Sequence, residues 1–126
     1  MRPGIGPGIG PGIGWLLASV CLSSLGHLAL KLAARSLRMP ERLAELLPAV
    51  LGNPWLPVGV TLHVLALGLW LIGLRQVALS IAYPFIALGL VLVSLLSWSV
   101  LGEQLRAAQW LGIALIATGV LVVAAR

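Results

Sequence analysis

Three polar side chains of different chemistry recur at a spacing of four residues in the first apolar run of the chain. They are Ser23, His27 and Lys31, and Ser24 falls close to the same line. Residues four apart share one face of an α-helix, so this spacing predicts a polar stripe along the helix. A hydroxyl forms hydrogen bonds, an imidazole carries a proton and an ammonium group binds phosphate. Lys31 is the best single candidate: it either holds a lipid phosphate or serves as a topology anchor at the membrane surface.

Carboxylates are few, and none is expected inside an apolar run. The chain contains Glu41, Glu45 and Glu103 but no Asp, and all three lie at the ends of apolar runs or between them. A transporter that exchanges protons for cationic drugs needs a titratable acid within the membrane, which argues against that class. His27 and His63 remain as possible proton relays, although a single histidine in a helix is more often a hydrogen-bonded packing residue.

The sequence contains no pattern typical of catalysis. It has no paired carboxylates, no cluster with the spacing of metal ligands, no glycine-rich phosphate loop that opens a helix and no Cys–His pair with a supporting acid. We therefore predict that the protein is not an enzyme and that it uses no metal and no cofactor.

The composition places the chain in a membrane. Of its 126 residues, 60% are hydrophobic and only 9% are charged, and the mean hydropathy is +1.11. A soluble domain has about 25% charged residues, so this chain cannot cover its surface with charge. The net charge of +5 does not indicate nucleic acid as a partner, because the basic residues are scattered at the ends of apolar runs.

Four apolar runs are long enough to cross a bilayer, at about residues 14–34, 55–74, 81–101 and 107–125. The third, 81–101, is uncharged over 21 residues, which gives roughly 30 Å of helix, the thickness of the hydrocarbon core. We predict an all-α membrane protein with four transmembrane helices.

Two further segments flank the first span. Residues 1–14 carry three PGIG repeats and are expected to form an irregular leader, so that the four-helix domain covers residues 15–126. Between the first and second spans, charged and apolar residues alternate, and Pro40 suits the first turn of a helix over residues 41–47. This pattern predicts a short amphipathic helix on the membrane surface, with a plain polar loop as the alternative.

The third and fourth spans contain residues that favour bending and close packing. Tyr83 is followed by Pro84, which either marks the start of the third span or frees a backbone carbonyl inside it. Gly112 and Gly119 are seven residues apart and share one face of the fourth span, which would let two such helices approach closely in a dimer.

Three motifs in the order and spacing found here resemble the small multidrug resistance-type fold of the drug/metabolite transporter superfamily, over about residues 15–125. They are Leu22–Lys31 (LSSLGHLALK), the pair of sequences Ser80–Pro84 (SIAYP) and Gly102–Leu105 (GEQL), and Leu111–Val120 (LGIALIATGV). The drug-exporting branch has an essential Glu at the position of Ser23. Because it lacks that Glu, this chain resembles instead the EamA-type subunits that flip aminoarabinose-phosphoundecaprenol. Those subunits have Gln in place of His27.

The resemblance implies a dimeric flippase subunit in the bacterial inner membrane, with a polyprenyl-phosphate-linked amino sugar of the lipid A modification pathway as its substrate. Its partners would be membrane lipids and either a second copy or a second four-helix subunit. The candidate substrate-binding residues are Ser23, His27, Lys31, Tyr83 and Glu103, and the candidate dimer residues are Gly112 and Gly119. Two alternatives remain: an exporter of small molecules or cations that uses histidines for protons, and an accessory subunit that stabilises a partner without transporting anything.

Overall fold

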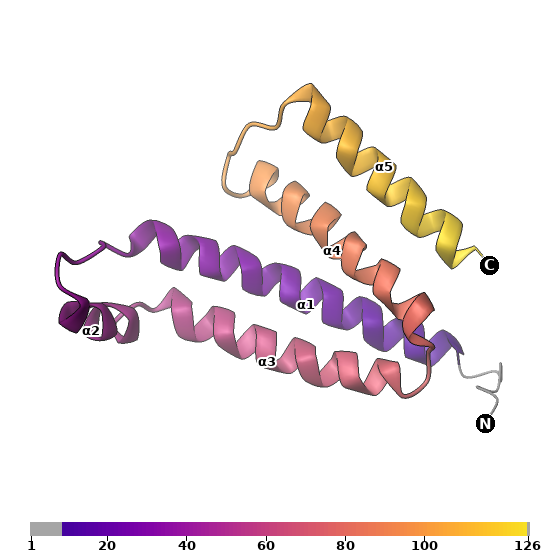
Figure 1. The fold of residues 1–126 in the computed structure, drawn as a ribbon, viewed down its shortest axis with the longest axis horizontal. Coiled ribbons are helices and arrows are strands. Elements are labelled where there is room, and N and C mark those ends of the chain that lie inside the picture. Colours follow the sequence, from indigo (N-terminus) through magenta and orange to yellow (C-terminus); the bar gives the residue numbers. More distant parts are fainter. Residues whose placement is uncertain (1–8, 126) are drawn as a thin grey trace.

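The computed structural model describes residues 9–125, which form helices joined by short connections (Figure 1). The long helices run back and forth, and a short helical segment lies between the first and the second of them. In chain order the elements are α1 (Ile9–Ser36), the 3-10 turn η1 (Leu43–Glu45), α2 (Leu46–Leu51), α3 (Trp55–Leu74), α4 (Leu79–Ser99) and α5 (Ala107–Ala124).

The four predicted spans are confirmed as helices α1, α3, α4 and α5, each long and apolar enough to cross a membrane. Helices α3, α4 and α5 contain 20, 21 and 18 residues, which corresponds to roughly 27–32 Å at 1.5 Å per residue. The third span begins two residues earlier than predicted, at Leu79, so Pro84 lies inside α4 rather than at its start. Its missing N–H removes the helical donor for the carbonyl of Ser80.

Helix α1 begins at Ile9, five residues before the predicted start, so the end of the PGIG segment is helical and not irregular. Pro11 is tolerated because the N–H groups of the first helical turn have no partner within the helix. Gly12 is required by packing, since a Cβ there would lie 2.5 Å from Cγ2 of Val77. Residues 1–8 of the predicted leader lie outside the described part of the chain.

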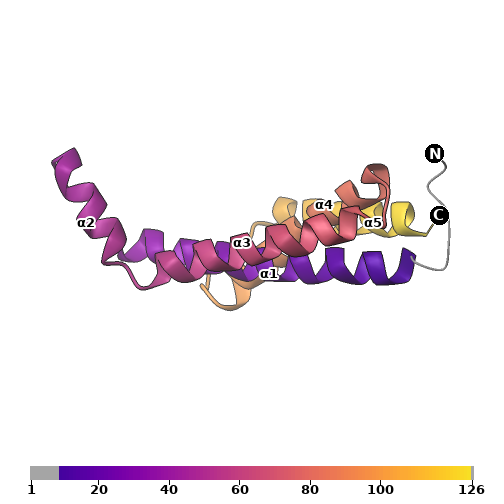
Figure 2. The ribbon, with the colours of Figure 1, turned by 90° about the horizontal axis from the view of Figure 1, so that it is seen from below.

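The short helix between the first two spans is confirmed, although it lies later than predicted. It comprises η1 and α2 and covers residues 43–51 rather than 41–47. Pro48, and not Pro40, occupies the first turn of α2. The large side chains of Leu43, Leu47 and Leu51 are exposed at four-residue spacing, which gives the segment an apolar face. Figure 2 shows α2 at one end of the molecule, turned away from the long helices.

Small residues repeated every seven positions hold α1 against α3, and we call this contact the small-residue seam. A Cβ on Gly59 would lie 3.2 Å from the carbonyl oxygen of Gly26, and a Cβ on Gly26 would lie 3.3 Å from that of Gly59. The backbones are thus close enough that only small residues fit between them. The seam consists of Gly12, Ser19, Gly26 and Ala33 on α1 and of Gly59, Ala66 and Gly73 on α3, all of them buried.

Asn53 ties the far end of this helix pair together. Its buried side chain donates to the carbonyl oxygen of Ala33 at 3.1 Å and to the hydroxyl of Ser36 at 2.8 Å, and it accepts from the backbone N–H of Trp55 at 3.0 Å. One amide group therefore satisfies polar groups at the end of α1 and at the beginning of α3.

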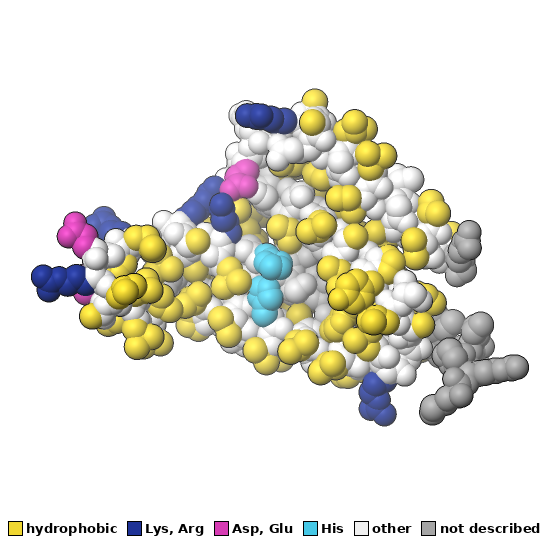
Figure 3. Space-filling view, viewed as in Figure 1, with side chains coloured by type: hydrophobic (Ala, Val, Ile, Leu, Met, Phe, Trp, Pro, Cys, Tyr) yellow, Lys and Arg dark blue, Asp and Glu magenta, His cyan; other side chains and the backbone are white. Residues whose placement is uncertain are grey.

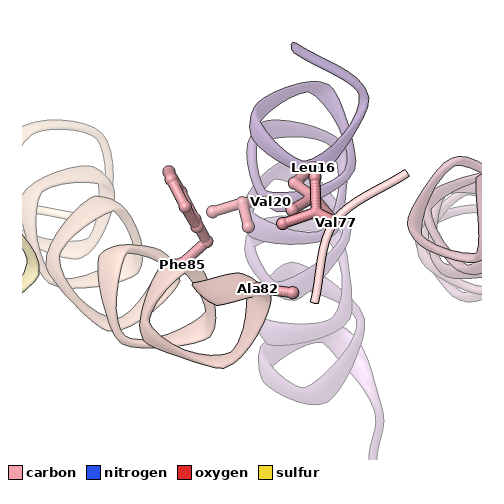
Figure 4. Packing of buried hydrophobic residues seen from close by; sticks show 5 residues of the cluster. All are labelled: Leu16, Val20, Val77, Ala82 and Phe85. Atoms are coloured by element: carbon pink, nitrogen blue, oxygen red, sulfur yellow. The ribbon is translucent and has the colours of Figure 1, made fainter. Parts of the chain in front are cut away.

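Helix α4 packs on the other side of α1 through a small apolar cluster. Figure 4 shows Leu16 and Val20 of α1 meeting Val77, Ala82 and Phe85 from the start of α4 and the connection before it. From this cluster α4 diverges from α1 toward its end at Ser99 (Figure 1). Helix α5 lies along α4 on the outside and makes its helix–helix contacts only with α4 among the described elements.

Candidate functional site

A cavity of about 550 Å³ lies between α1, α3 and α4, beyond the apolar cluster. Its lining is mostly apolar but includes six polar side chains, and we call it the polar cavity after them. Serines and both histidines supply its polar groups, and apolar side chains of α3 and α4 supply the rest. Figure 3 shows the two histidine side chains in the hollow on this face of the molecule. The polar residues that line the cavity are Ser19, Ser23, Ser24, His27, His63 and Ser94.

The serine hydroxyls of the cavity donate hydrogen bonds to backbone carbonyls. Ser19 donates to the carbonyl oxygen of Ala66 across the small-residue seam at 2.6 Å. Three other hydroxyls donate to carbonyls of their own helix, three or four residues earlier: Ser23, Ser24 and Ser94. A hydroxyl has one proton and two lone pairs, so the half-buried Ser23 and Ser94 offer acceptors to the cavity, whereas Ser19 and Ser24 are almost fully buried. The cavity therefore suits a ligand that is rich in donors, such as hydroxyl or ammonium groups.

The two histidines meet edge to face in this cavity. Their ring centroids are 4.7 Å apart and the planes are inclined at 88°. Nδ1 of His63 lies 2.8 Å from the carbonyl oxygen of Gly59, so in the neutral ring Nδ1 carries the proton and Nε2 is an acceptor. Gly26 makes room for this ring, because a Cβ at that position would lie 2.6 Å from Nδ1.

A charged cluster lies at the end of α1 nearest to the α4–α5 connection. Oε1 of Glu103 forms ion pairs with Lys31 Nζ at 3.4 Å and with Arg35 at 3.3 Å. Arg35 also donates a hydrogen bond to this oxygen, and the hydroxyl of Ser97 donates to Oε2. The cluster is half-exposed, with 36–50% of each charged side chain accessible. In Figure 3 basic and acidic side chains meet on the same face as the histidines.

The charged cluster and the polar cavity lie next to each other along α1. A second hollow, of about 300 Å³, is lined by Lys31, Ser97 and Glu103, and it shares Ser24 and His27 with the polar cavity. We call the two hollows together the polar groove. Ser19 and Lys31 are twelve residues apart on α1, so the groove extends over roughly 18 Å along this helix.

The surroundings of Glu103 favour its charged form. The hydrogen bond from the Ser97 hydroxyl is the largest cause that lowers the pKa of this carboxyl below its usual value. Partial desolvation raises the pKa, whereas the charges of Lys31 and Arg35 lower it further. Glu103 is thus an anion at neutral pH, and it offsets one of the two positive charges beside it.

The structure brings together four of the five predicted substrate-binding residues: Ser23, His27, Lys31 and Glu103 line the polar groove. Tyr83 lies elsewhere. It is 61% exposed and does not line either hollow, because its neighbours Ala82 and Phe85 face the core and helical geometry turns Tyr83 to another side.

Sequence reasoning did not find Arg35 and Ser97 as members of the site. The signal for Arg35 was its position four residues after Lys31, on the same face of one helix. Ser97 gave no comparable signal, since it reaches Glu103 only through the bend of the chain after α4. The predicted dimer residues Gly112 and Gly119 lie on α5, where a Cβ would meet no atom within 4 Å.

The arrangement defines a class: a multi-pass membrane protein with a polar groove between its helices. The chain belongs to the EamA-like transporter family, whose profile matches residues 12–125. This confirms the predicted family, and it makes the chain a transporter-family protein and not an enzyme.

Curated relatives carry a more particular name. The chain is 36% identical over 107 residues to the "Probable 4-amino-4-deoxy-L-arabinose-phosphoundecaprenol flippase subunit ArnE" of Salmonella paratyphi C (strain RKS4594), with 85% of this chain and 90% of the relative covered. The proteins of the same name from Salmonella choleraesuis (strain SC-B67) and Salmonella newport (strain SL254) match with the same identity and coverage. No solved structure matches the chain significantly.

Proposed function

We propose that the protein is a flippase subunit that translocates a polyprenyl-phosphate-linked amino sugar across the bacterial inner membrane, in the pathway that modifies lipid A. The observation that carries this proposal is the polar groove, which has hydrogen-bond acceptors along α1 and cations at one end. An amino sugar presents hydroxyl and ammonium donors, and its phosphate presents an anion. The two halves of the groove are complementary to these two halves of the headgroup.

The path would let the headgroup cross without entering hydrocarbon. Charged groups are costly inside a bilayer, so a lipid flippase needs a polar route for the headgroup while the chain stays in lipid. Ser23 and His27 would line this route, and Lys31 would bind the phosphate near the membrane surface. The polyprenyl tail would remain outside among the many exposed leucines and valines of α3 and α4.

A dimer fits this function, with either a second copy or a second four-helix subunit as the partner. Small transporters commonly assemble their substrate path from two similar halves. In this proposal α5 provides the contact through Gly112 and Gly119, because its small residues face open space.

The test is headgroup accessibility in proteoliposomes that contain aminoarabinose-phosphoundecaprenol. A membrane-impermeant amine reagent labels only outer-leaflet headgroups, so labelling beyond one half of the lipid reports flipping. Lys31→Ala is expected to slow flipping about tenfold or more, the effect of losing one charge-assisted hydrogen bond. Arg75→Ala is the matched control, since it removes one cation at the end of α3, away from the groove.

Labelling that stops at one half with wild-type protein would contradict translocation of this lipid by the chain alone. Normal flipping by the Lys31 variant would contradict the phosphate role. The contact between His27 and His63 favours a second candidate, an exporter that moves protons through the histidines. Transport of a small cation that depends on a pH gradient, and is lost when either histidine is replaced, would indicate that candidate instead.

A further inference from the structure

The ion pairs of Glu103 have a geometry that a bound phosphate could reproduce. Lys31 and Arg35 both contact one carboxylate oxygen, Oε1, at 3.4 and 3.3 Å, and Ser97 donates to the other oxygen. A phosphate group likewise presents several oxygens to a lysine, an arginine and a hydroxyl. We propose that Glu103 is an internal counter-ion that occupies the phosphate-binding position, and that the phosphate of the substrate displaces it on entering the groove.

We call Lys31, Arg35 and Ser97 together the anion site. This inference rests on the proposed function for the source of the phosphate, but it adds two residues and an exchange step. Two cations and one carboxylate leave one net positive charge in the cluster. A phosphodiester carries one negative charge, as the carboxylate does, so the exchange leaves the charge of the anion site unchanged.

The two partners of the exchange come from different parts of the fold. Lys31 and Arg35 are one turn apart on α1, where helical geometry holds their backbones in place. Glu103 lies in the connection between α4 and α5, directly after Gly102, which has a φ of +69° that favours glycine. The carboxylate can therefore leave through a change in its own side chain while both cations keep their positions.

The counter-ion also explains how a groove with two adjacent cations could release an anion. A phosphate held by Lys31, Arg35 and Ser97 without competition would be retained, whereas Glu103 competes for the same three donors and returns when the headgroup leaves. Since exposed ion pairs are individually weak, the competition should shift affinity without abolishing binding.

The experiment measures by calorimetry the affinity of the detergent-solubilised full chain for the methyl ester of farnesyl phosphate, a phosphodiester with one negative charge that is called farnesyl phosphate below. Glu103→Gln keeps the size of the side chain but removes its charge, and it is expected to tighten binding by about three- to tenfold, as the loss of two weak ion pairs allows. Arg35→Gln is expected to weaken binding about tenfold. The matched control is Glu45→Gln, which removes the same charge in η1, outside the groove.

A Glu103 that only supports the fold would give the opposite result: Glu103→Gln would bind farnesyl phosphate equally well or more weakly, and that outcome overturns the exchange. If this variant does not fold, Ser97→Asp provides a second measurement, because an added carboxylate beside the cations should weaken binding several-fold. Unchanged affinity in that variant would also overturn the proposal.

Two further comparisons are needed. The first distinguishes a lipid-borne phosphate from free phosphate, and the second distinguishes failure of the exchange from failure of the proposed function. Inorganic phosphate that competes at the concentration of farnesyl phosphate would assign the anion site to free phosphate, and its failure to compete would assign the site to a lipid-borne group. Tighter binding by Glu103→Gln together with no flipping by the wild type would support the exchange but not the cargo. Flipping by the wild type together with unchanged affinity in Glu103→Gln would support the cargo but contradict the exchange.

Discussion

Lys31 and Arg35 are one helical turn apart on α1, and two like charges at this spacing repel each other. Glu103 offsets this repulsion because its carboxylate forms ion pairs with both side chains. The same three residues thus serve the fold and, in our proposal, the substrate. This dual use centres on Glu103, whose pKa the hydroxyl of Ser97 lowers.

Ser97→Ala is expected to raise the pKa of Glu103 toward its usual value of 4.5, because the Ser97 hydrogen bond is the largest cause of the lowering. The folded pKa lies below the unfolded one, so the ion pairs persist at neutral pH and are lost as pH falls through the folded pKa. In the variant they should be lost at a higher pH. A ¹³C NMR titration of the Glu103 carboxyl measures the midpoint, and an unchanged midpoint would contradict the assigned cause.

Part of this site could be predicted from the sequence because helical spacing is a local property. Ser23, His27 and Lys31 were expected on one face from their four-residue intervals alone, and all three line the groove. His63 and Ser97 join them from other helices. Their positions depend on how α3 and α4 pack on α1, which no spacing within a single helix can define.

At the scale of elements, the small-residue seam organises the molecule. It brings α1 and α3 so close that Ser19 can donate to a carbonyl of the other helix, and it places the two histidines in contact. Its seven-residue repeat is present in the sequence, but so is the seven-residue interval between Gly112 and Gly119, which lies on a different helix. Packing decides which face of small residues contacts which helix, and this cannot be derived from spacing within one helix. Gly12 was also hidden because it lies in a segment that was expected to be irregular but is part of α1.

Gly59→Val is expected to lower the stability of the protein by about 1–3 kcal/mol, the usual cost of overpacking. Even a Cβ at this position would lie 2.7 Å from Leu30 and 3.2 Å from the carbonyl oxygen of Gly26, so the two helices must separate. Gly68→Val on the same helix is the matched control, since a Cβ there meets no atom within 4 Å. Thermal unfolding in detergent compares the two, and equal melting temperatures would contradict the role of the seam.

At the scale of the whole molecule, the four spans are unequally joined. Helices α1 and α3 form a tight pair, α4 is attached to α1 mainly near its start, and α5 contacts α4 alone among the described elements. Val120 is the one buried residue of the described part of α5. Long apolar side chains on α5 face lipid at no cost, but its small residues leave a shallow surface that another helix can fill.

The open surface of α5 is the contact that we propose for a dimer. Gly112→Leu is expected to shift the protein from dimer toward monomer, because a large side chain on the glycine face of α5 keeps the partner helix away. Ala114→Leu is the matched control, since residues two apart on a helix point about 200° from each other, so this change adds similar bulk on the other side. Cross-linking and native mass spectrometry in detergent measure the oligomer. A dimer that survives Gly112→Leu but is lost with Ala114→Leu would place the contact on the opposite flank of α5, and a monomeric wild type would remove the contact altogether. In either case the polar groove, which is built within one chain from α1, α3 and α4, would still have to be tested by itself for flipping.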